Sequence, residues 1–304
     1  MSIERVAIIG LGLLGGSVGL AVAEHLPHVA TSGYDADPEV RRRAAERALV
    51  GTICETPEDA VRQADLVMLC VPVGAIGAAA RAFAAALPEH AIVSDVGSSK
   101  QSVGTALADA LPGHRVIPAH PVAGTERSGP DAGFATLFHH RWCIVTPPED
   151  ADPANVAALV EFWESLGAMV DTMDVEHHDL VLAVTSHIPH LIAYTIVGTA
   201  SDLEDVTRGE VIKSSAGGFR DFTRIAASDP TMWRDVFLHN REAVLEMLDR
   251  FLTDLAMMRE AIRASDGTTM FDLFTRTREI RRSIVAIGQD DARPDFGRKH
   301  NGDS

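Results

Sequence analysis

The sequence is poor in positive charge, and this shortage excludes whole classes of partner. Its 304 residues carry 43 acidic against 27 basic side chains, which gives a formal net charge of −16. Because basic patches supply most of the affinity for nucleic acid and for anionic membrane surfaces, we expect neither as a partner. An anionic substrate would need a locally positive pocket.

Cysteine and long apolar runs are scarce as well. Cys54, Cys70 and Cys143 follow no metal-ligand spacing and give no sign of an oxidising compartment. No apolar run approaches the length of a membrane span, and the N-terminus lacks a signal-peptide pattern. We therefore expect a cytoplasmic protein without a metal site. The apolar content of 46% over 304 residues suffices for two folded domains.

The N-terminus predicts a dinucleotide-binding turn. Residues 5–9 predict a buried strand, residues 17–23 predict a helix, and Gly10-Leu-Gly-Leu-Leu-Gly15 lies between them. In this setting the first glycine permits a tight turn, and the second lets the backbone approach a pyrophosphate. The third lets helix and strand pack closely, and the helix N-terminus offers free N–H groups to the phosphates.

Asp35 predicts which dinucleotide is bound. It ends a second predicted strand at residues 29–34, where a carboxylate can bind the ribose 2′-hydroxyl. A carboxylate there repels a 2′-phosphate, so NAD is favoured over NADP. Arg41, Arg42 and Arg43 follow on the next predicted helix and favour a phosphate, unless they form a solvated helix face.

Strands and helices continue to alternate, which predicts an α/β fold with a doubly wound parallel sheet of Rossmann type. Further buried strands are expected at residues 66–71 and 91–96, helices at 75–86 and 100–111, and edge strands at 141–146 and 168–172.

After Asp174 only helical periodicity remains. The apolar-periodic stretches lie at residues 175–202, 230–264 and 270–286. We therefore expect a dinucleotide-binding domain over residues 1–174 and an all-helical domain over residues 175–304, with the substrate between them.

One stretch, Ala119-His-Pro-Val-Ala-Gly-Thr-Glu-Arg-Ser-Gly-Pro130, predicts a functional loop. It follows an apolar run at residues 115–118 and gathers polar side chains, His120 first among them, between glycines and prolines. Loops at strand ends carry function because a rigid scaffold aims them. On its own the stretch is equally well explained as a polar surface turn with a bystander histidine.

Two other places carry polar side chains where a ligand is expected. Ser98 lies at the carboxyl end of a predicted strand, where open α/β sheets bind ligands, although Ser98 or Ser99 must also cap the next helix. His187 and His190 share one face of a predicted helix that Pro189 kinks. The alternatives are two structural histidines, or a zinc site that lacks a third ligand.

Arg224 is a candidate for binding an anion. It follows Gly217 and Gly218, which permit close approach, and a guanidinium binds a carboxylate bidentately. The alternative is a surface salt bridge. Trp233, further along, is expected in the core.

Taken together, these stretches resemble the TyrA family, the prephenate and arogenate dehydrogenases of tyrosine biosynthesis. Separate motifs carry the resemblance in the family's order, and the histidine signature is the most specific. The motifs are Gly10-Leu-Gly-Leu-Leu-Gly-Gly-Ser17, Gly97-Ser98 with Lys100, His120-Pro-Val-Ala-Gly-Thr-Glu-Arg-Ser-Gly129, Ser186-His-Ile-Pro-His190, Asp221-Phe-Thr-Arg-Ile-Ala226 and Asp229-Pro-Thr-Met-Trp-Arg-Asp235.

The resemblance implies NAD-dependent oxidative decarboxylation of prephenate or arogenate by a homodimer joined through the helical domain. It implies that His120 is the catalytic base, that Ser98 supports it, and that Arg224 binds a substrate carboxylate. We expect further substrate contacts from Thr125, Glu126, Asp131, His187 and His190. The expected cofactor-binding residues are Gly10, Gly12, Leu13, Leu14, Gly15, Asp35, Val71 and Pro72.

The choice between the two substrates depends on an acidic side chain. Arogenate carries an ammonium on its side chain and prephenate does not, so a nearby carboxylate favours arogenate. Asp131 is the first candidate and Glu126 the second, unless both are solvated loop carboxylates. We hypothesise that this chain uses arogenate at least as well as prephenate.

Two other functions fit a dinucleotide domain followed by helices. A β-hydroxyacid dehydrogenase has a similar architecture and uses a lysine of its helical domain. Lys213 is the only lysine between Lys100 and Lys299, and its neighbours match that motif poorly. An NAD-sensing module would bind the dinucleotide and show no turnover.

Overall fold

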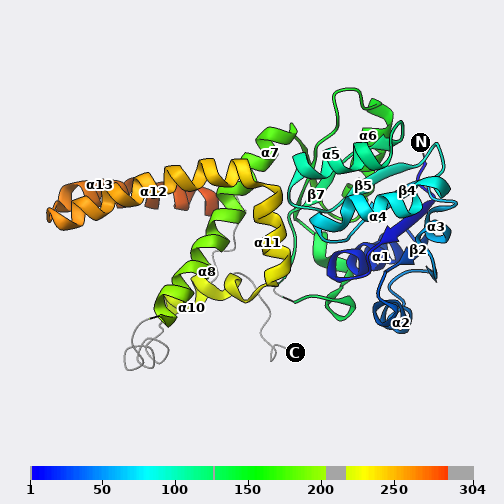
Figure 1. Cartoon of the computed structure of the whole chain (residues 1–304), viewed down its shortest axis with the longest axis horizontal. Helices are drawn as coiled ribbons and strands as arrows, with labels where there is room; N and C mark the ends of the chain where they lie inside the picture. The colour runs from blue at the N-terminus through cyan, green and yellow to red at the C-terminus, as the bar shows by residue number, and fades with distance from the viewer. Residues whose placement is uncertain (1, 126, 203–216, 287–304) are drawn as a thin grey trace. The chain divides into compact units, whose positions relative to one another are not determined.

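A six-stranded parallel sheet forms in the order β3-β2-β1-β4-β5-β6, and Figure 1 labels three of its strands, β2, β4 and β5. The computed structural model describes residues 2–125, 127–202 and 217–286. The strands of this sheet are β1 (Arg5–Ile9), β2 (Ala30–Tyr34), β3 (Thr52–Ile53), β4 (Leu66–Leu69), β5 (Ile92–Asp95) and β6 (Arg115–Val116). The order and the parallel pairing confirm the doubly wound sheet.

Helices cover both faces of this sheet, because its strands bury side chains on both sides. Val6 and Ile8 of β1 belong to one apolar core, while Ala7 and Ile9 belong to another. Successive side chains of a strand point to opposite faces, so a strand covered twice is a continuous apolar run. The covering helices are α1 (Leu13–His25), α2 (Pro38–Glu46), α3 (Pro57–Val61), α4 (Ile76–Phe83), α5 (Lys100–Ala110) and α6 (Pro153–Ser165).

The two expected edge strands do not extend this sheet, and that prediction was wrong. β8 (Trp142–Val145) and β9 (Met169–Thr172) form a separate sheet with β7 (Ala119–Pro121), in the order β7-β8-β9. Pro118 has no N–H with which to continue the ladder beside β5, and the chain crosses to pair with β8 instead. His120 therefore lies in a strand and not in the expected loop.

The predicted helix at residues 175–202 is interrupted. α7 (Val175–Leu182) passes through a π-helical turn (Ala183–His187) into α8 (Ile188–Ser201). Pro189 therefore lies in the first turn of α8, where its missing N–H costs little. By length and hydropathy, residues 175–201 also pass a test for a membrane span, which the core helix of a soluble protein passes as well.

After β9 the described residues form only helices, as the sequence predicts. α10 (Gly217–Thr223), α11 (Pro230–His239), α12 (Arg241–Arg263) and α13 (Gly267–Ala286) complete the described chain. The predicted helix at residues 230–264 is divided at Asn240. By its internal contacts the chain separates into two units, Met1–Met247 and Leu248–Ser304, and the residues described next lie in the first.

Candidate active site

The glycine turn after β1 has two positions closed by packing and one that is open. A Cβ at Gly10, where φ is +97°, would lie 2.6 Å from the carbonyl oxygen of Cys70. A Cβ at Gly15 would lie 1.9 Å from the carbonyl oxygen of Gly10. A Cβ at Gly12, the N-cap of α1, would have no atom within 4 Å. This open helix N-terminus fits a dinucleotide pyrophosphate.

An acidic and a basic side chain lie together at the end of β2. One carboxylate oxygen of Asp35 accepts the N–H of Leu11 at 2.8 Å. Arg41 donates to the carbonyl oxygen of Asp35 at 2.8 Å and lies over the Tyr34 ring, with its side chain only 15% exposed. Arg41 is therefore not part of a solvated helix face.

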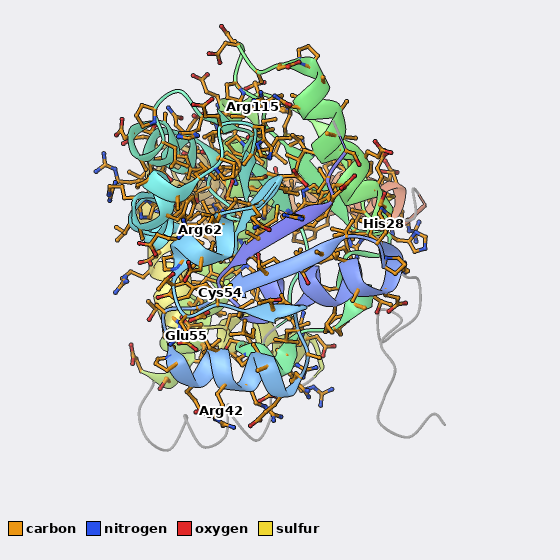
Figure 2. All side chains as sticks on the ribbon, turned by 90° about the vertical axis from the view of Figure 1, so that its right-hand side faces the viewer. His28, Arg42, Cys54, Glu55, Arg62 and Arg115 are labelled. Atoms are coloured by element: carbon orange, nitrogen blue, oxygen red, sulfur yellow. The ribbon has the colours of Figure 1, made fainter. Side chains whose placement is uncertain are left out.

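The other expected cofactor residues surround this turn. Arg42 is exposed, as a solvated face requires, and Figure 2 shows it on the outer side of α2, whereas Arg43 is partly exposed. Leu13 and Leu14 open α1 and are half-buried. Val71 and Pro72 follow β4 at the carboxyl edge of the sheet.

His120 is buried in β7, and its side chain is hydrogen-bonded to a second histidine. Its Nδ1 lies 3.0 Å from Nε2 of His178, and the two rings meet edge to face. Burial lowers the pKa of His120 well below its ordinary value, and positive charge on His178, Lys100 and His187 acts in the same direction. The imidazole is therefore neutral near pH 7, as a base must be.

His178 continues to a carboxylate. Its Nδ1 lies 2.8 Å from Oδ1 of Asp179, and both side chains are buried. Asp179 also accepts the backbone N–H groups of Lys100 at 2.7 Å and Gln101 at 3.0 Å, at the N-terminus of α5. The carboxylate thereby caps a helix of the dinucleotide-binding half.

The prediction that Ser98 or Ser99 caps α5 was therefore wrong. Ser99 is the N-cap residue and its side chain makes no capping hydrogen bond. A carboxylate accepts both free N–H groups at once, which a serine hydroxyl does not match. Ser98 is half-buried in the loop between β5 and α5.

A buried ion pair lies beside the strand of His120. Lys100 and Asp95 are both fully buried and joined by a hydrogen bond. Lys100 Nζ also donates to the carbonyl oxygen of Ala119 at 2.7 Å, and Asp95 accepts the N–H of Ala119. Burial lowers the pKa of Lys100, and Asp95 opposes that shift. The pair fixes the backbone on the N-terminal side of His120.

The two predicted histidines of the helical half come together on an aromatic ring. His190 stacks on Trp233 with ring centroids 3.6 Å apart, and His187 meets the same ring edge to face. Asn240 bonds the Nδ1 of His187 at 3.0 Å and the carbonyl oxygen of Asp179 at 2.8 Å. A continuous set of contacts thus joins His120 to His190.

Two buried nitrogens belong to the rings of this set. Within the described residues, Nε2 of His187 and Nε1 of Trp233 are buried without a hydrogen-bond partner. Burial lowers the pKa of His187 to about 4. Trp233 is buried, as expected.

The remaining predicted residues lie in several places. Arg224 follows α10 and is exposed. The pKa of His190 is lowered, mainly by burial; the hydrogen bond to the Ser186 carbonyl opposes this shift, and the positive charge of Arg224 adds to it. Thr125 accepts the N–H of Arg127, and Asp131 pairs with Arg43 at 2.7 Å. Glu126 and Lys213 lie outside the described residues.

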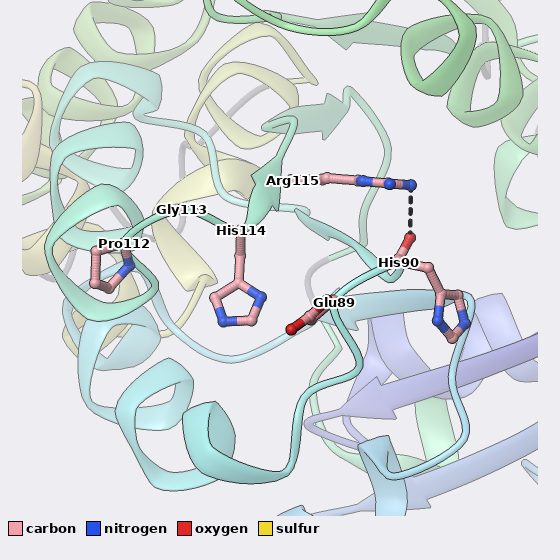
Figure 3. Close-up of a pocket in the computed structure, with 6 residues that line it drawn as sticks. All are labelled: Glu89, His90, Pro112, Gly113, His114 and Arg115. Carbon is pink, nitrogen blue, oxygen red and sulfur yellow. Dashed lines mark hydrogen bonds between the residues drawn. The ribbon is translucent and has the colours of Figure 1, made fainter.

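A surface hollow lies elsewhere, between the segments that enter β5 and β6 (Figure 3). Arg115 bonds the carbonyl oxygen of His90 across it at 3.1 Å. This is the amino edge of the sheet, whereas open α/β sheets bind ligands at the carboxyl edge. We assign it no role. The described residues also hold no cluster of three or more potential metal ligands.

Sequence reasoning missed His178, Asp179 and Asn240. The run His177-His178-Asp179 inside an apolar-periodic helix was the available indication, because buried polar groups need partners. The identity of those partners depends on segments far apart in the chain.

Known proteins confirm the resemblance over both halves. The family model "Prephenate dehydrogenase, nucleotide-binding domain" matches residues 18–172, and "Prephenate dehydrogenase, dimerization domain" matches residues 174–276. The cyclohexadienyl dehydrogenase of Zymomonas mobilis is 44% identical over 92% of this chain and 96% of its own. The prephenate dehydrogenase of Bacillus subtilis is 31% identical over 92% and 76%.

A solved structure agrees in fold and sequence. Prephenate dehydrogenase from A. aeolicus, in complex with hydroxyphenyl propionate and NAD+, superimposes with a TM-score of 0.86 at 32% identity. The alignment covers 93% of this chain and 99% of that one. This chain belongs to the prephenate dehydrogenase family.

Proposed function

We propose that this chain is an NAD-dependent dehydrogenase that oxidises and decarboxylates prephenate or arogenate, with His120 as the base. The observation that carries the proposal is a buried neutral histidine, held in a strand and backed by hydrogen bonds, in a chain of this family. The family models and relatives do not favour the β-hydroxyacid alternative.

The chemistry needs a base, a hydride acceptor and an anion site. His120 takes the proton of the ring hydroxyl while hydride leaves the same carbon. NAD, when bound, supplies the hydride acceptor. Cleavage of the bond to the ring carboxylate then releases CO2, and its electron pair makes the ring aromatic. The ring oxygen becomes anionic and takes a proton back.

The glycine turn and Asp35 would hold the dinucleotide. Gly12 leaves the approach to the N-terminus of α1 open, and Asp35 ends β2 beside it. We keep the proposal that the dinucleotide-binding domain spans residues 1–174 and the helical domain residues 175–304. Ser98, half-buried at the carboxyl end of β5, supports His120 in this proposal.

Arg224 would bind a substrate carboxylate in this otherwise acidic protein, and His190 would contact the substrate. The positive charge of Arg224 contributes to lowering the pKa of His190, which supports a role for both residues in one substrate site. For the arogenate preference, Asp131 would have to act while paired with Arg43. An unchanged ratio of arogenate to prephenate turnover in Asp131→Asn would remove the basis for that preference.

We also propose a cytoplasmic homodimer joined through the helical domain. The matching family model is named a dimerization domain. The helices α12 and α13 expose large apolar side chains, among them Leu252, Leu255, Phe271 and Phe274. Sedimentation of the purified protein at several concentrations tests the dimer.

NADH formation tests the proposed function directly. Purified protein is offered prephenate and arogenate separately, each with NAD and with NADP. We expect turnover of at least one acid with NAD, and His120→Asn should keep NADH affinity while kcat falls by about 10²–10⁴. Binding of NAD without turnover of either acid would contradict the proposal.

A further inference from the structure

Two buried residues next to His120 have no role in the function proposed so far. His178 and Asp179 follow each other in α7, and the exposed fractions of their side chains are 0% and 6%. His178 is hydrogen-bonded to His120 through one ring nitrogen and to Asp179 through the other. The Asp179 carboxylate also accepts a backbone N–H at the N-terminus of α5. A buried carboxylate and a buried imidazole are costly unless every hydrogen bond is made, so this arrangement calls for an explanation.

With both rings neutral, the hydrogen bonds allow one consistent placement of protons. Asp179 accepts two backbone N–H groups at a helix N-terminus, a setting that stabilises negative charge. A carboxylate accepts, so Nδ1 of His178 donates to it. Burial lowers the pKa of His178, and in the neutral ring Nε2 is then an acceptor. Nδ1 of His120 must therefore donate, which leaves the lone pair on its Nε2.

We propose that His178 and Asp179 are positioning residues that hold His120 in the tautomer with its proton on Nδ1, so that Nε2 is free to act as the base. The inference rests on the role of His120 in the proposed function. A neutral imidazole presents either nitrogen as the base, and a partner on the other nitrogen decides which. Here that partner is a second histidine, oriented in turn by a carboxylate.

The same hydrogen bonds can persist while the proton moves to His120 and back during the reaction. When Nε2 takes the hydroxyl proton, His120 becomes a cation whose Nδ1–H still donates to His178. The carboxylate of Asp179 lies behind that ring and stabilises the charge. After CO2 leaves, the ring oxygen is anionic and recovers the proton from Nε2. No proton has to travel along His178, which therefore keeps its own tautomer throughout.

Asp179 also connects the two histidines to helix α5 of the dinucleotide-binding half. Its carboxylate bonds the first turn of α5, and its carbonyl oxygen accepts from Asn240. The groups that face the two histidines from other elements are Lys100 on α5, Asp95 on β5 and His187 in the π-helical turn. Any change in the pH profile has to be judged against these groups.

Steady-state kinetics of His178→Gln test the proposal. Gln removes the imidazole that joins Asp179 to His120, and we expect kcat to fall about 10²–10³-fold while KM changes little. Asp179→Asn should act in the same direction, because an amide can donate to His178 and permit the opposite tautomer. A larger loss, on the order of 10⁴, follows in a serine protease when the carboxylate that orients its catalytic histidine becomes an amide.

The matched control is His177→Gln, which changes an exposed histidine one position earlier on the same helix and should leave kcat unchanged. A purely structural role would move both KM and NADH affinity and would lower kcat even without the base. In the His120→Asn background, His178→Gln should therefore cause no further loss. An additive loss there, or full activity of His178→Gln, would overturn the proposal.

A readout independent of turnover separates this inference from the proposed function. Nitrogen-15 spectra of histidine-labelled wild-type protein report the tautomer of each ring. In the wild type we expect His120 to carry its proton on Nδ1 and none on Nε2. In Asp179→Asn we expect the tautomer of His120 with its proton on Nε2 to become populated. A wild-type His120 that carries its proton on Nε2 would overturn the proposal even if the enzyme turns over, and the spectrum decides the matter if His178→Gln fails to fold.

Discussion

The glycine turn and the surroundings of His120 are built in opposite ways. At Gly12 the turn leaves open space, because a Cβ there would have no atom within 4 Å. Around His120 the site consists of buried polar side chains that bond one another and come from β5, α5, β7 and α7. The glycine turn depends on the absence of a side chain, whereas the surroundings of His120 depend on every hydrogen-bond partner being present.

This contrast predicts where a single substitution does most damage. In the polar cluster, removing one member leaves another buried and unpaired. In the turn, an added atom lowers stability only at positions already in contact, whereas at the open position it would affect only the bound dinucleotide.

Lys100→Met should have the largest effect on stability. It leaves Asp95 buried without its counter-charge, which costs about 3–5 kcal/mol. Arg62→Met is the control, since that arginine forms an exposed pair with Asp59 worth at most about 1 kcal/mol. Urea unfolding at pH 7 measures both. Equal losses would mean that the buried pair contributes no more than a surface pair.

The buried histidines should make the protein sensitive to acid. His187 is neutral in the folded state, with a pKa of about 4, and titrates near 6.5 when unfolded. The unfolded state therefore binds more protons between these values, and stability falls as pH drops from 6.5 to 4. The full loss is roughly 3 kcal/mol.

His187→Gln should remove that part of the pH dependence. The free energy of unfolding, measured at pH 7, 6 and 5, should fall less steeply in this variant by about 1.4 kcal/mol per pH unit at most. His177→Gln changes an exposed histidine and should keep the wild-type slope. Parallel curves for wild type and His187→Gln would contradict the buried, neutral state of this ring.

Alanine at Gly15 and at Gly12 should separate packing from binding. Gly15→Ala places a Cβ against the carbonyl of Gly10 and should cost about 1–3 kcal/mol of stability. Gly12→Ala enters open space and should leave stability almost unchanged while weakening NAD binding. Thermal unfolding and NADH titration distinguish the two. Equal destabilisation by both would show that the turn has no open position.

Asp35→Ser should have the smallest effect, a change of cofactor preference. The substitution removes the carboxylate that repels a 2′-phosphate and leaves Arg41 beside the same strand end. We expect the ratio of NAD to NADP specificity to fall by about tenfold, which corresponds to about 1.4 kcal/mol. The kcat/KM values for the two cofactors measure it, and Arg42→Ser serves as the exposed control.

The same contrast explains what the sequence could predict. The turn is encoded within a few residues, so the spacing of Gly10, Gly12 and Gly15 was sufficient to predict strand, turn and helix. His120 was found because its neighbours form a recognisable run. Its partners were not, since they lie about 60 residues away and only folding brings them together.

Two errors have the same origin. Residues 141–146 and 168–172 were correctly predicted as strands, but strand propensity does not say which edge a strand pairs with. The cap of α5 was expected from an adjacent serine because most caps are local, and here a distant carboxylate replaces it.

That distant cap has a consequence for synthesis of the chain. The N-terminal half emerges from the ribosome first and begins to fold as a unit. Its helix α5 nevertheless lacks its capping carboxylate until Asp179 has been made, some 79 residues after Lys100. A nascent chain or a fragment that ends at residue 174 therefore presents a Rossmann sheet with one helix end uncapped and Lys100 near a surface that is still open to water. The dinucleotide-binding half becomes complete only when the start of the helical half has arrived.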